Sequence, residues 1–437
     1  MRCAGAPTGD TAGGGKRVSG RLRQPIGLDR DAWLVIGSNA TVGICQMGIL
    51  SVIQNLFLLR LGYGMETIGV LTSLGSITVA ALGLPIGFAS VRLGSRRCFI
   101  LAFGMATVGT LFLPFALVAY EPFRIFLLGV SRIVVFVGGT FFLVNVSPVL
   151  ASVTIPKNRN LAFAINGAAG SAGGILGSIL GGVLPIAFSV FAGKNLTSPH
   201  PFAYTAVIAG VLYFAFFIVA FGLRKSGQER NGHRDVEQGK APLAIVVMAS
   251  VHFLIGTGFG TASLFTVFLD STLHMSTSGI GFLLSASSIA SLLSVALMPF
   301  IASRLGKSRT VLVSILCMSL GMGIVGSSFD WIAVSLGWMI LAAFNAVMSP
   351  ALSVYIMELV PDRWRSLMSG AANSAYYIGN GISAMGGGFF VARVGFRGYY
   401  LTGACVLLAA LLLFRGFLLT RGSRGQGLPA AIEPGRA

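Results

Sequence analysis

Long apolar blocks dominate the sequence, and only a few polar or charged residues interrupt each of them. Blocks of about 18 or more nearly uncharged residues are typical of helices that cross a bilayer, where the backbone must satisfy its own hydrogen bonds. The strands of a membrane barrel would alternate in polarity over about ten residues, and the sequence lacks that alternation. The pattern predicts twelve spanning helices, at 33–59, 66–90, 98–120, 123–153, 161–191, 202–223, 242–269, 277–302, 310–329, 331–357, 367–392 and 398–420.

The composition and the charge distribution agree with a membrane protein. Of 437 residues, 54% are hydrophobic and only 10% are charged, too few to cover the surface of a soluble domain. The formal net charge of +18 suggests nucleic acid as a partner, but the basic residues gather in the two tails, the middle linker and every second loop. The positive-inside rule then places both termini in the cytoplasm. We therefore expect a multi-pass protein of the cell membrane, in contact with lipid and not with nucleic acid.

An internal repeat divides the chain into two halves. The tripeptide Arg-Leu-Gly at 92–94, after the second predicted helix, recurs at 304–306 after the eighth. The difference in residue number between the two tripeptides is the repeat offset. The same offset relates Ile-Gly at 68–69 to Ile-Gly at 280–281. Because each half contains an even number of spans, the two halves have the same orientation in the membrane. We therefore expect parallel repeats of six helices each.

A charged segment between the halves marks the domain boundary. Both ends of the chain are polar and rich in Gly and Arg, without a cleavable signal peptide, and we expect them to be disordered. The sequence thus predicts a cytoplasmic tail at 1–31, a first six-helix bundle at 32–223, a cytoplasmic linker at 224–241, a second bundle at 242–420 and a second tail at 421–437.

The loop after the second helix carries a recognisable motif. Residues 87–97 read Gly-Phe-Ala-Ser-Val-Arg-Leu-Gly-Ser-Arg-Arg, which resembles the loop motif of the major facilitator superfamily. That motif consists of a glycine, three residues, an aspartate, an arginine, one residue, a glycine and basic residues. The matching residues are Gly87, Arg92, Gly94, Arg96 and Arg97, while Val91 stands at the aspartate position. A degenerate second copy contains Arg304, Gly306 and Lys307.

This resemblance covers residues 32–420. It implies an all-α membrane protein in which twelve transmembrane helices form two pseudo-symmetric six-helix bundles. It also implies a secondary transporter that works by alternating access, the two bundles rocking about a site near the midplane. The loop motif would then help to hold the cytoplasmic side closed. Because Val91 replaces the acidic partner, contact between the basic residues and anionic lipid head groups is the alternative interpretation.

Arg132 stands alone as a charged residue well inside a predicted span, about nine residues into the fourth helix. Placing a charged side chain inside a bilayer costs free energy, so such a residue is a functional candidate by default. The family often has an arginine here, followed by glycines, and Gly138 and Gly139 follow Arg132. The resemblance implies a contact with the solute or with a proton relay. The alternative is that Arg132 pairs with backbone carbonyls or extends toward the outer interface.

The candidates for proton coupling are few. The middle of every predicted span lacks a carboxylate, and only Asp270 and Glu358 approach helices, near their ends. His252 lies about ten residues into the seventh helix, and its side chain has a suitable intrinsic pKa. Coupling through His252, Asp270 or Glu358 is therefore one hypothesis. Packing of His252 in a hydrogen bond, with uniport or coupling by another route, is the other.

Neutral polar residues inside the spans are more numerous. Amides offer hydrogen bonds without the cost of a charge, and aromatic rings offer apolar contact area. The resemblance implies that helices one, four, seven and ten line the cavity, with five, eight and eleven beside them. The alternative is that these amides join helices to one another. The candidates for solute binding, besides Arg132, are Asn39, Gln46, Asn145, Asn345, Tyr376, Tyr377 and Asn380.

The fifth helix contains Gly-Gly-Ile-Leu-Gly-Ser-Ile-Leu-Gly-Gly at 173–182, which is similar to the antiporter motif of the family with Ser178 in place of its proline. That motif is typical of exporters, although a glycine-rich packing face explains the same residues. The chain has no P-loop, no CxxC pair and only four scattered histidines, so we expect no ATP drive, cofactor, metal site or catalytic group.

The sequence as a whole predicts a secondary transporter, expected to be a monomer, that exports a small neutral or amphipathic solute, with a proton as the candidate coupling ion. An uptake transporter or facilitator for a small organic anion or sugar, which would use Arg132, is the alternative within this class. A receptor or scaffold that does not transport is the alternative from another class.

Overall fold

The computed structural model describes residues 28–155, 158–223 and 242–422, and these residues form helices joined by short turns. The predicted linker and most of both predicted tails lie outside the described residues. The first half contains α1 (Arg30–Val42), the π-helix η1 (Gly43–Leu50), α2 (Ser51–Arg60), α3 (Met65–Leu93), α4 (Ser95–Phe115), α5 (Phe123–Ser152), α6 (Arg159–Phe191) and α7 (His200–Ala220). The second half contains α8 (Pro242–Gly260), the 3-10 helix η3 (Thr261–Leu264), α9 (Phe265–Ser271), α10 (Thr277–Leu305), α11 (Lys307–Ser327), α12 (Trp331–Leu359) and α13 (Asp362–Gly422).

The described part of the chain has 11 helical segments that are long and apolar enough to cross a membrane. The last of them, in α13, contains two spans. Helix α13 is 61 residues long and contains Gly395 with φ 85° and ψ 170°, outside the helical region. The Tyr399 hydroxyl donates to the Ser383 carbonyl at 2.9 Å. Sixteen residues of straight helix would separate these groups by about 24 Å, so α13 folds back on itself as two arms. The prediction of twelve spans is therefore confirmed.

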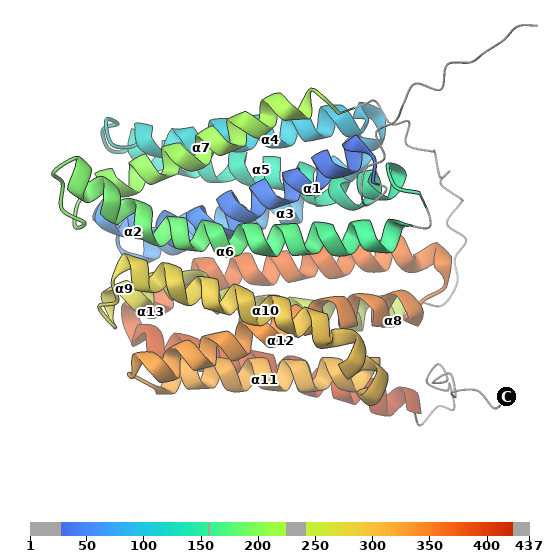
Figure 1. The fold of residues 1–437 in the computed structure, drawn as a ribbon. Helices are drawn as coiled ribbons and strands as arrows, with labels where there is room; N and C mark the ends of the chain where they lie inside the picture. The colour runs from blue at the N-terminus through green and yellow to red at the C-terminus, as the bar shows by residue number, and fades with distance from the viewer. Residues whose placement is uncertain (1–27, 156–157, 224–241, 423–437) are drawn as a thin grey trace, which may run out of the picture.

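The two halves repeat each other in structure as well as in sequence. Helix α3 runs from 65 to 93 and α4 from 95 to 115, and the bounds of α10 and α11 match all four at the repeat offset. Gly94 and Gly306 join these helix pairs, with φ 78° in both and ψ of 157° and 155°. A positive φ favours glycine, so the Gly of each Arg-Leu-Gly tripeptide ends its helix. Figure 1 shows the two halves packed along their length, with α6 and α10 side by side at the boundary.

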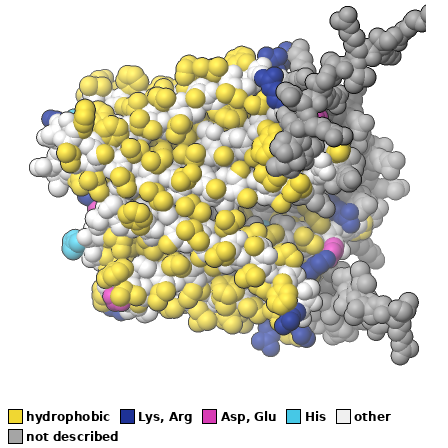
Figure 2. Space-filling view, in the orientation of Figure 1, with side chains coloured by type: hydrophobic (Ala, Val, Ile, Leu, Met, Phe, Trp, Pro, Cys, Tyr) yellow, Lys and Arg dark blue, Asp and Glu magenta, His cyan; other side chains and the backbone are white. Residues whose placement is uncertain are grey.

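The molecule has two different ends, the termini end and the loop end. The termini end is where α1 begins at Arg30 and α13 stops at Gly422, and the loop end is where α2 stops at Arg60. Figure 2 shows hydrophobic side chains over the body between the ends, while most of the visible Lys and Arg side chains lie toward the termini end. An apolar belt between two polar rims is the surface that a bilayer requires of a multi-pass protein.

Within the first half, glycines allow α6 to approach the first span closely. A Cβ on Gly177 would lie 2.1 Å from the Ile44 carbonyl oxygen, and a Cβ on Gly48 would lie 2.3 Å from the Gly177 Cα. These distances leave no room for any other residue, so the glycine run of the fifth span serves close packing against η1.

Between the halves, two glycine crossings lie near the loop end. In one, α10 meets α6, and a Cβ on Gly281 would lie 2.7 Å from the Gly182 Cα. In the other, α3 meets α13, and a Cβ on Gly69 would lie 3.0 Å from the Gly388 Cα. Gly69 and Gly281 are separated by the repeat offset and so occupy matching positions. The halves therefore touch backbone to backbone at two places that the repeat makes equivalent.

Candidate functional site

A central cavity of about 600 Å³ lies between the two halves. Its volume is typical of a site for a small organic molecule. It adjoins a second compartment of about 530 Å³, with which it shares residues on α5, α10 and η1. The second compartment lies nearer the termini end, since it reaches Asn39 in α1 and Asn166 in the first part of α6. Both halves line the central cavity, through Gln46, Met47, Leu50, Ser51, Gln54, Asn55, Thr72, Arg132, Phe136 and Ser178 in the first half and Phe259, Ala262, Ser263, Phe265, Thr266, Leu284, Ser287, Ser288, Ser291, Trp338, Ala342, Asn345, Ala346 and Asn380 in the second.

Arg132 brings a positive charge to the wall of this cavity. Its side chain is buried, with 6% of the residue exposed. The guanidinium donates to Gln54 Oε1, to Asn55 Oδ1 at 2.8 Å and to Thr72 Oγ1 at 3.5 Å. All three acceptors are neutral, and the acidic residues that the structure describes lie away from the cavity lining. Arg132 is therefore well hydrogen-bonded but lacks a counter-charge at the site. Burying an unpaired charge in a membrane costs free energy.

Two polar contacts at the cavity join the halves. The Asn55 side chain, besides accepting from Arg132, donates through Nδ2 to the Ser263 carbonyl at 2.8 Å. The Ser76 hydroxyl on α3 donates to Asn380 Oδ1 on α13 at 2.7 Å. These bonds must break or lengthen if the halves move apart at this level, so the polar wall is linked to the relative position of the halves.

Several polar atoms on the cavity wall are buried and have no hydrogen-bond partner among the described residues. They include Gln54 Nε2, Ser178 Oγ and Thr266 Oγ1 in the central cavity and Asn166 Oδ1 in the second compartment. A buried polar group without a partner costs about 1–3 kcal/mol. The site therefore offers hydrogen bonds to water or to a bound solute.

Aromatic rings form part of the opposite wall. The rings of Phe265 and Trp338 stack with their centroids 3.6 Å apart and their planes at 4°. Phe259 also lines the cavity from the second half. Stacked rings hold a flat apolar surface rigidly, so this wall suits apolar or planar parts of a solute.

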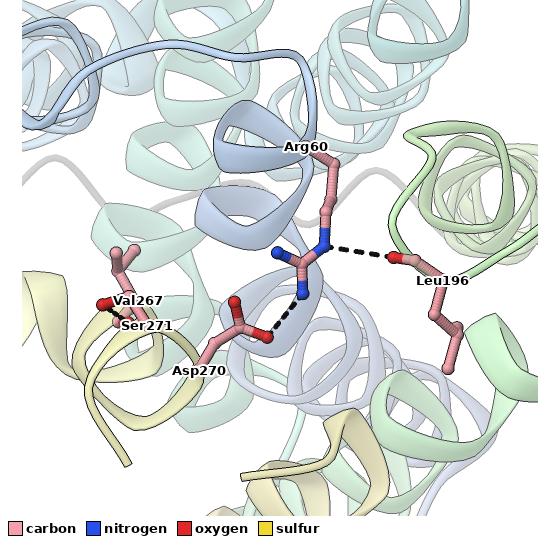
Figure 3. A network of polar contacts seen from close by, with 5 residues as sticks. All are labelled: Arg60, Leu196, Val267, Asp270 and Ser271. Carbon is pink, nitrogen blue, oxygen red and sulfur yellow. Dashed lines mark hydrogen bonds and ion pairs between the residues drawn. The ribbon is translucent and has the colours of Figure 1, made fainter. Parts of the chain in front are cut away.

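An ion pair closes the loop end beside the cavity (Figure 3). Arg60, the last residue of α2, points toward Asp270 on α9, and the Nη2 to Oδ1 distance is 2.6 Å. Arg60 Nε also donates to the Leu196 carbonyl at 3.1 Å, in the loop between α6 and α7. The two charged side chains are only 22% and 10% exposed. Of the three ion pairs in the described part of the chain, this one joins the two halves.

Comparison with known families decides what this architecture is. The sequence model of the Major Facilitator Superfamily matches residues 35–249 and, a second time, residues 248–435. The chain belongs to the Major Facilitator Superfamily. The fold, with its repeated halves and central cavity, is thus that of a superfamily of membrane transporters.

Solved structures agree on the fold of this superfamily member. A bacterial homologue of the human lysosomal transporter Spinster, in an inward-facing and unoccupied conformation, superimposes with a TM-score of 0.66 at 16% identity, covering 91% of this chain and 98% of that one. The nucleoside transporter NupG gives 0.67 at 13% identity, covering 89% and 99%. The human organic anion transporter MFSD10 gives 0.59 at 15%, covering 88% and 100%. No curated protein matches the sequence itself.

The structure brings together most of the residues that the sequence suggested for solute binding in this facilitator. The exceptions are Asn145 and Tyr376. Asn145 donates to Ser90 Oγ and to the Phe141 carbonyl, both at 2.8 Å, and so joins α5 to α3 inside the first half. Tyr376 lies outside both linings, with its ring 5.4 Å from that of Tyr377. The residues on the walls are Asn39, Gln46, Arg132, Asn345, Tyr377 and Asn380.

The candidates for coupling do not line either compartment. The His252 Nδ1 is 2.8 Å from the Met248 carbonyl one turn earlier in α8. Asp270 forms the ion pair of the loop end. Glu358 pairs with Lys307 at the termini end, within the second half, and both side chains are exposed. The structure thus places the three candidates in three separate environments.

The loop-motif residues lie at the termini end, on either side of the turns at Gly94 and Gly306. Arg92 and Arg97 are exposed and Arg96 is half-buried, while Gly87 lies in the last two turns of α3. In the second copy, the Arg304 guanidinium lies 4.4 Å from the Phe300 ring centroid. The contacts of Arg304 and Lys307 both stay within the second half, so their role as a gate remains a prediction.

Sequence reasoning missed Gln54, Thr72, Ser263, Thr266 and Trp338 on the cavity wall. Ser and Thr are common in membrane helices, where many bond to their own backbone, so residue type alone gave no signal. The internal repeat does contain a sequence signal that could have found two of these residues. Gln54 and Thr266 are separated by the repeat offset, and both line the cavity and have a buried side-chain atom without a partner among the described residues.

Proposed function

We propose that this chain is a secondary active transporter that moves a small neutral or amphipathic organic solute through the central cavity by alternating access. The observation that carries this proposal is the cavity itself, which both halves line and whose walls hold buried polar atoms without a hydrogen-bond partner in the described part of the chain. Such a site between two repeated bundles is where a facilitator binds its solute. A receptor or scaffold would not need unpartnered hydrogen-bonding groups at the interface of its halves.

The arrangement of contacts supports a conformation open toward the termini end. At the loop end the halves meet through the Arg60–Asp270 ion pair and through the glycine crossings. Toward the termini end the cavity continues into the second compartment. With the basic residues placing both termini in the cytoplasm, this is an inward-facing state of a protein in the cell membrane.

Export is the direction that we propose for transport. It rests on the similarity of the fifth span to the antiporter motif of the family. The structure gives the glycines of that span a packing role against η1, which is compatible with either direction. Ser178, which replaces the proline of the motif, lines the central cavity, and its buried hydroxyl has no partner within the described ranges.

Uptake of a small organic anion or sugar is the second candidate, and one observation favours it. Arg132 lines the cavity with only neutral acceptors around its guanidinium. A solute that carries a negative charge would supply the missing counter-charge. NupG transports nucleosides and MFSD10 organic anions by name, and both share the fold with this chain.

Flux into proteoliposomes tests transport. Ser288 lines both compartments, and its hydroxyl bonds to the Leu284 carbonyl, so Ser288→Trp fills the cavity without removing an interhelical bond. Ser250 makes the same kind of bond to the Val246 carbonyl but is exposed on α8, so Ser250→Trp is the matched control. We expect Ser288→Trp to abolish solute flux and Ser250→Trp to leave it unchanged.

The same vesicles test direction and coupling. Sided preparations, with and without an imposed pH gradient, separate export from uptake and coupled transport from uniport. Flux equal to that of protein-free vesicles for neutral amphipathic solutes, organic anions and sugars alike would contradict the proposal and favour a receptor or scaffold.

A further inference from the structure

The two walls of the central cavity differ because the repeat has diverged at the residues that face it. Gln54 and Thr266 occupy matching positions, one repeat offset apart, and so do Thr72 and Leu284. All four line the cavity. In each pair the first half presents the more polar side chain. At these two pairs of positions the first half forms the more polar of two facing walls, called the polar wall, although the second half also lines the cavity with Ser263, Asn345 and Asn380.

The fourth and tenth spans place two further side chains on the cavity wall, although these do not occupy matching repeat positions. Arg132 is the tenth residue of α5, and Trp338 is the eighth residue of α12, the corresponding helix of the second half. The two residues therefore lie at similar depth on corresponding helices, and both line the cavity. The first half thus contributes a cation to the cavity wall, and the second half contributes an aromatic ring.

The polar wall offers hydrogen-bond donors. The guanidinium of Arg132 can only donate, and the Oε1 of Gln54 and the Oδ1 of Asn55 already accept from it. The Gln54 Nε2, a further donor, is buried without a partner among the described residues. A wall with a positive charge and spare N–H groups is complementary to an anionic group with several acceptor oxygens.

The opposite wall suits a planar apolar body. Phe265 is 1% exposed and fixes the Trp338 ring by stacking at 3.6 Å. Trp338 itself is half-buried at the cavity surface. A ring held from behind in this way presents a flat surface at little entropic cost, and aromatic partners gain stacking contacts beyond simple burial.

We propose that the solute of this transporter is an aromatic carboxylate, whose carboxylate binds Arg132 and the Gln54 amide while its ring lies against Trp338. This inference rests on the proposed function and narrows the amphipathic solute to an aromatic anion. The carboxylate would supply the counter-charge that the cavity lacks. The ring would lie where the second half presents Trp338 stacked on Phe265.

Equilibrium binding to the purified full-length protein at neutral pH tests the proposal with three matched probes. The probes are 2-naphthoate, its neutral amide 2-naphthamide and the saturated acid decahydro-2-naphthoate. We expect 2-naphthoate to bind more than about tenfold more tightly than either of the others, since one loses the charge and the other the ring. Equal affinity for the acid and the amide, or for the aromatic and the saturated acid, would overturn the proposal.

Variants assign the two preferences to their residues. Arg132→Gln should remove the preference for the acid over the amide, and Arg132→Lys should keep part of it. Trp338→Leu should remove the preference for the aromatic acid and leave the preference for charge. Gel filtration and thermal unfolding check that each variant is folded, and Asn145→Ala, outside the cavity, should keep both preferences. An Arg132→Gln protein that is folded and still prefers the acid would contradict the assignment.

Flux measurements separate this proposal from the more general one. Transport of neutral amphipathic solutes, without binding or transport of 2-naphthoate, would overturn the aromatic-carboxylate assignment and leave a transporter. Tight and selective binding of 2-naphthoate without flux of any solute would support the site and overturn the transport function.

Discussion

Arg60 Nη2 lies 2.6 Å from Asp270 Oδ1, and this bond joins the two halves of the protein at the loop end. The two residues are 210 positions apart in the chain and are carried by the first and seventh spans. In the proposed alternating-access cycle the halves separate at this end to open the cavity there, so we expect the ion pair to be present in one conformation and broken in the other. The proposed cycle therefore predicts that the ion pair stabilises the state that the structure shows.

Removing this ion pair should shift the protein toward the state with an open loop end. Because both side chains are partly exposed, the pair contributes about 1 kcal/mol, and Asp270→Asn should change the conformational equilibrium by roughly fivefold. Distances between spin labels on either side of the loop end, measured by electron paramagnetic resonance, report the shift. The variant in which the two charges are exchanged, Arg60→Asp with Asp270→Arg, should restore the closed loop-end state in part.

A matched control for this prediction is Lys307→Gln. It breaks the ion pair with Glu358, which lies at the other end and within one half. We expect the distance distribution at the loop end to stay unchanged in this variant. A shift as large as that of Asp270→Asn would show that loss of any ion pair loosens the molecule.

The glycine crossings should tolerate no side chain. A Cβ on Gly281 would lie 2.5 Å from the Ser178 carbonyl oxygen, so Gly281→Ala must push α10 away from α6. We expect a loss of about 1–3 kcal/mol in the closed loop-end state, seen as a lower thermal unfolding temperature and greater labelling of cysteines placed in the interface. Gly323→Ala on α11, where the added Cβ meets open space, should be neutral or stabilising.

A carboxylate placed beside Arg132 should compete with an anionic solute. Gln54→Glu keeps the shape of the side chain and supplies a counter-charge to the guanidinium that now donates to Gln54 Oε1. We expect 2-naphthoate binding to weaken by more than about tenfold, because the solute loses the unbalanced charge that attracts it. Gln46→Glu, elsewhere on the wall, is the control and should weaken binding less. Equal effects of the two variants would mean that overall cavity charge, and not Arg132, governs binding.

Proton coupling should not depend on His252. Its ring bonds to the backbone of its own helix, at Met248, and it does not line the cavity. We therefore expect His252→Gln to leave both solute flux and its response to a pH gradient unchanged in proteoliposomes. Flux that persists but no longer responds to the gradient would instead place His252 on the proton path.

The gross architecture was predictable because the bilayer restricts what a sequence can do. A backbone in lipid must be helical over about 20 residues, so apolar blocks mark spans without knowledge of their neighbours. The repeat was equally visible, since the Arg-Leu-Gly tripeptides at 92–94 and 304–306 end helices whose bounds differ by one constant offset. The fold and its two halves follow from these local patterns.

The faces of the helices were not predictable in the same way. Asn145 and Asn380 are both amides inside apolar spans, yet Asn145 joins α5 to α3 while Asn380 lines the cavity. Which way an amide points depends on the rotation of its helix, and packing with several neighbours sets that rotation. The sequence by itself therefore determined how many times the chain crosses the membrane and that it does so as two equivalent halves. Only the tertiary structure decided which polar groups meet Arg132 and that Arg60 reaches Asp270, because those contacts join residues whose separation in sequence carries no signal of their distance in space.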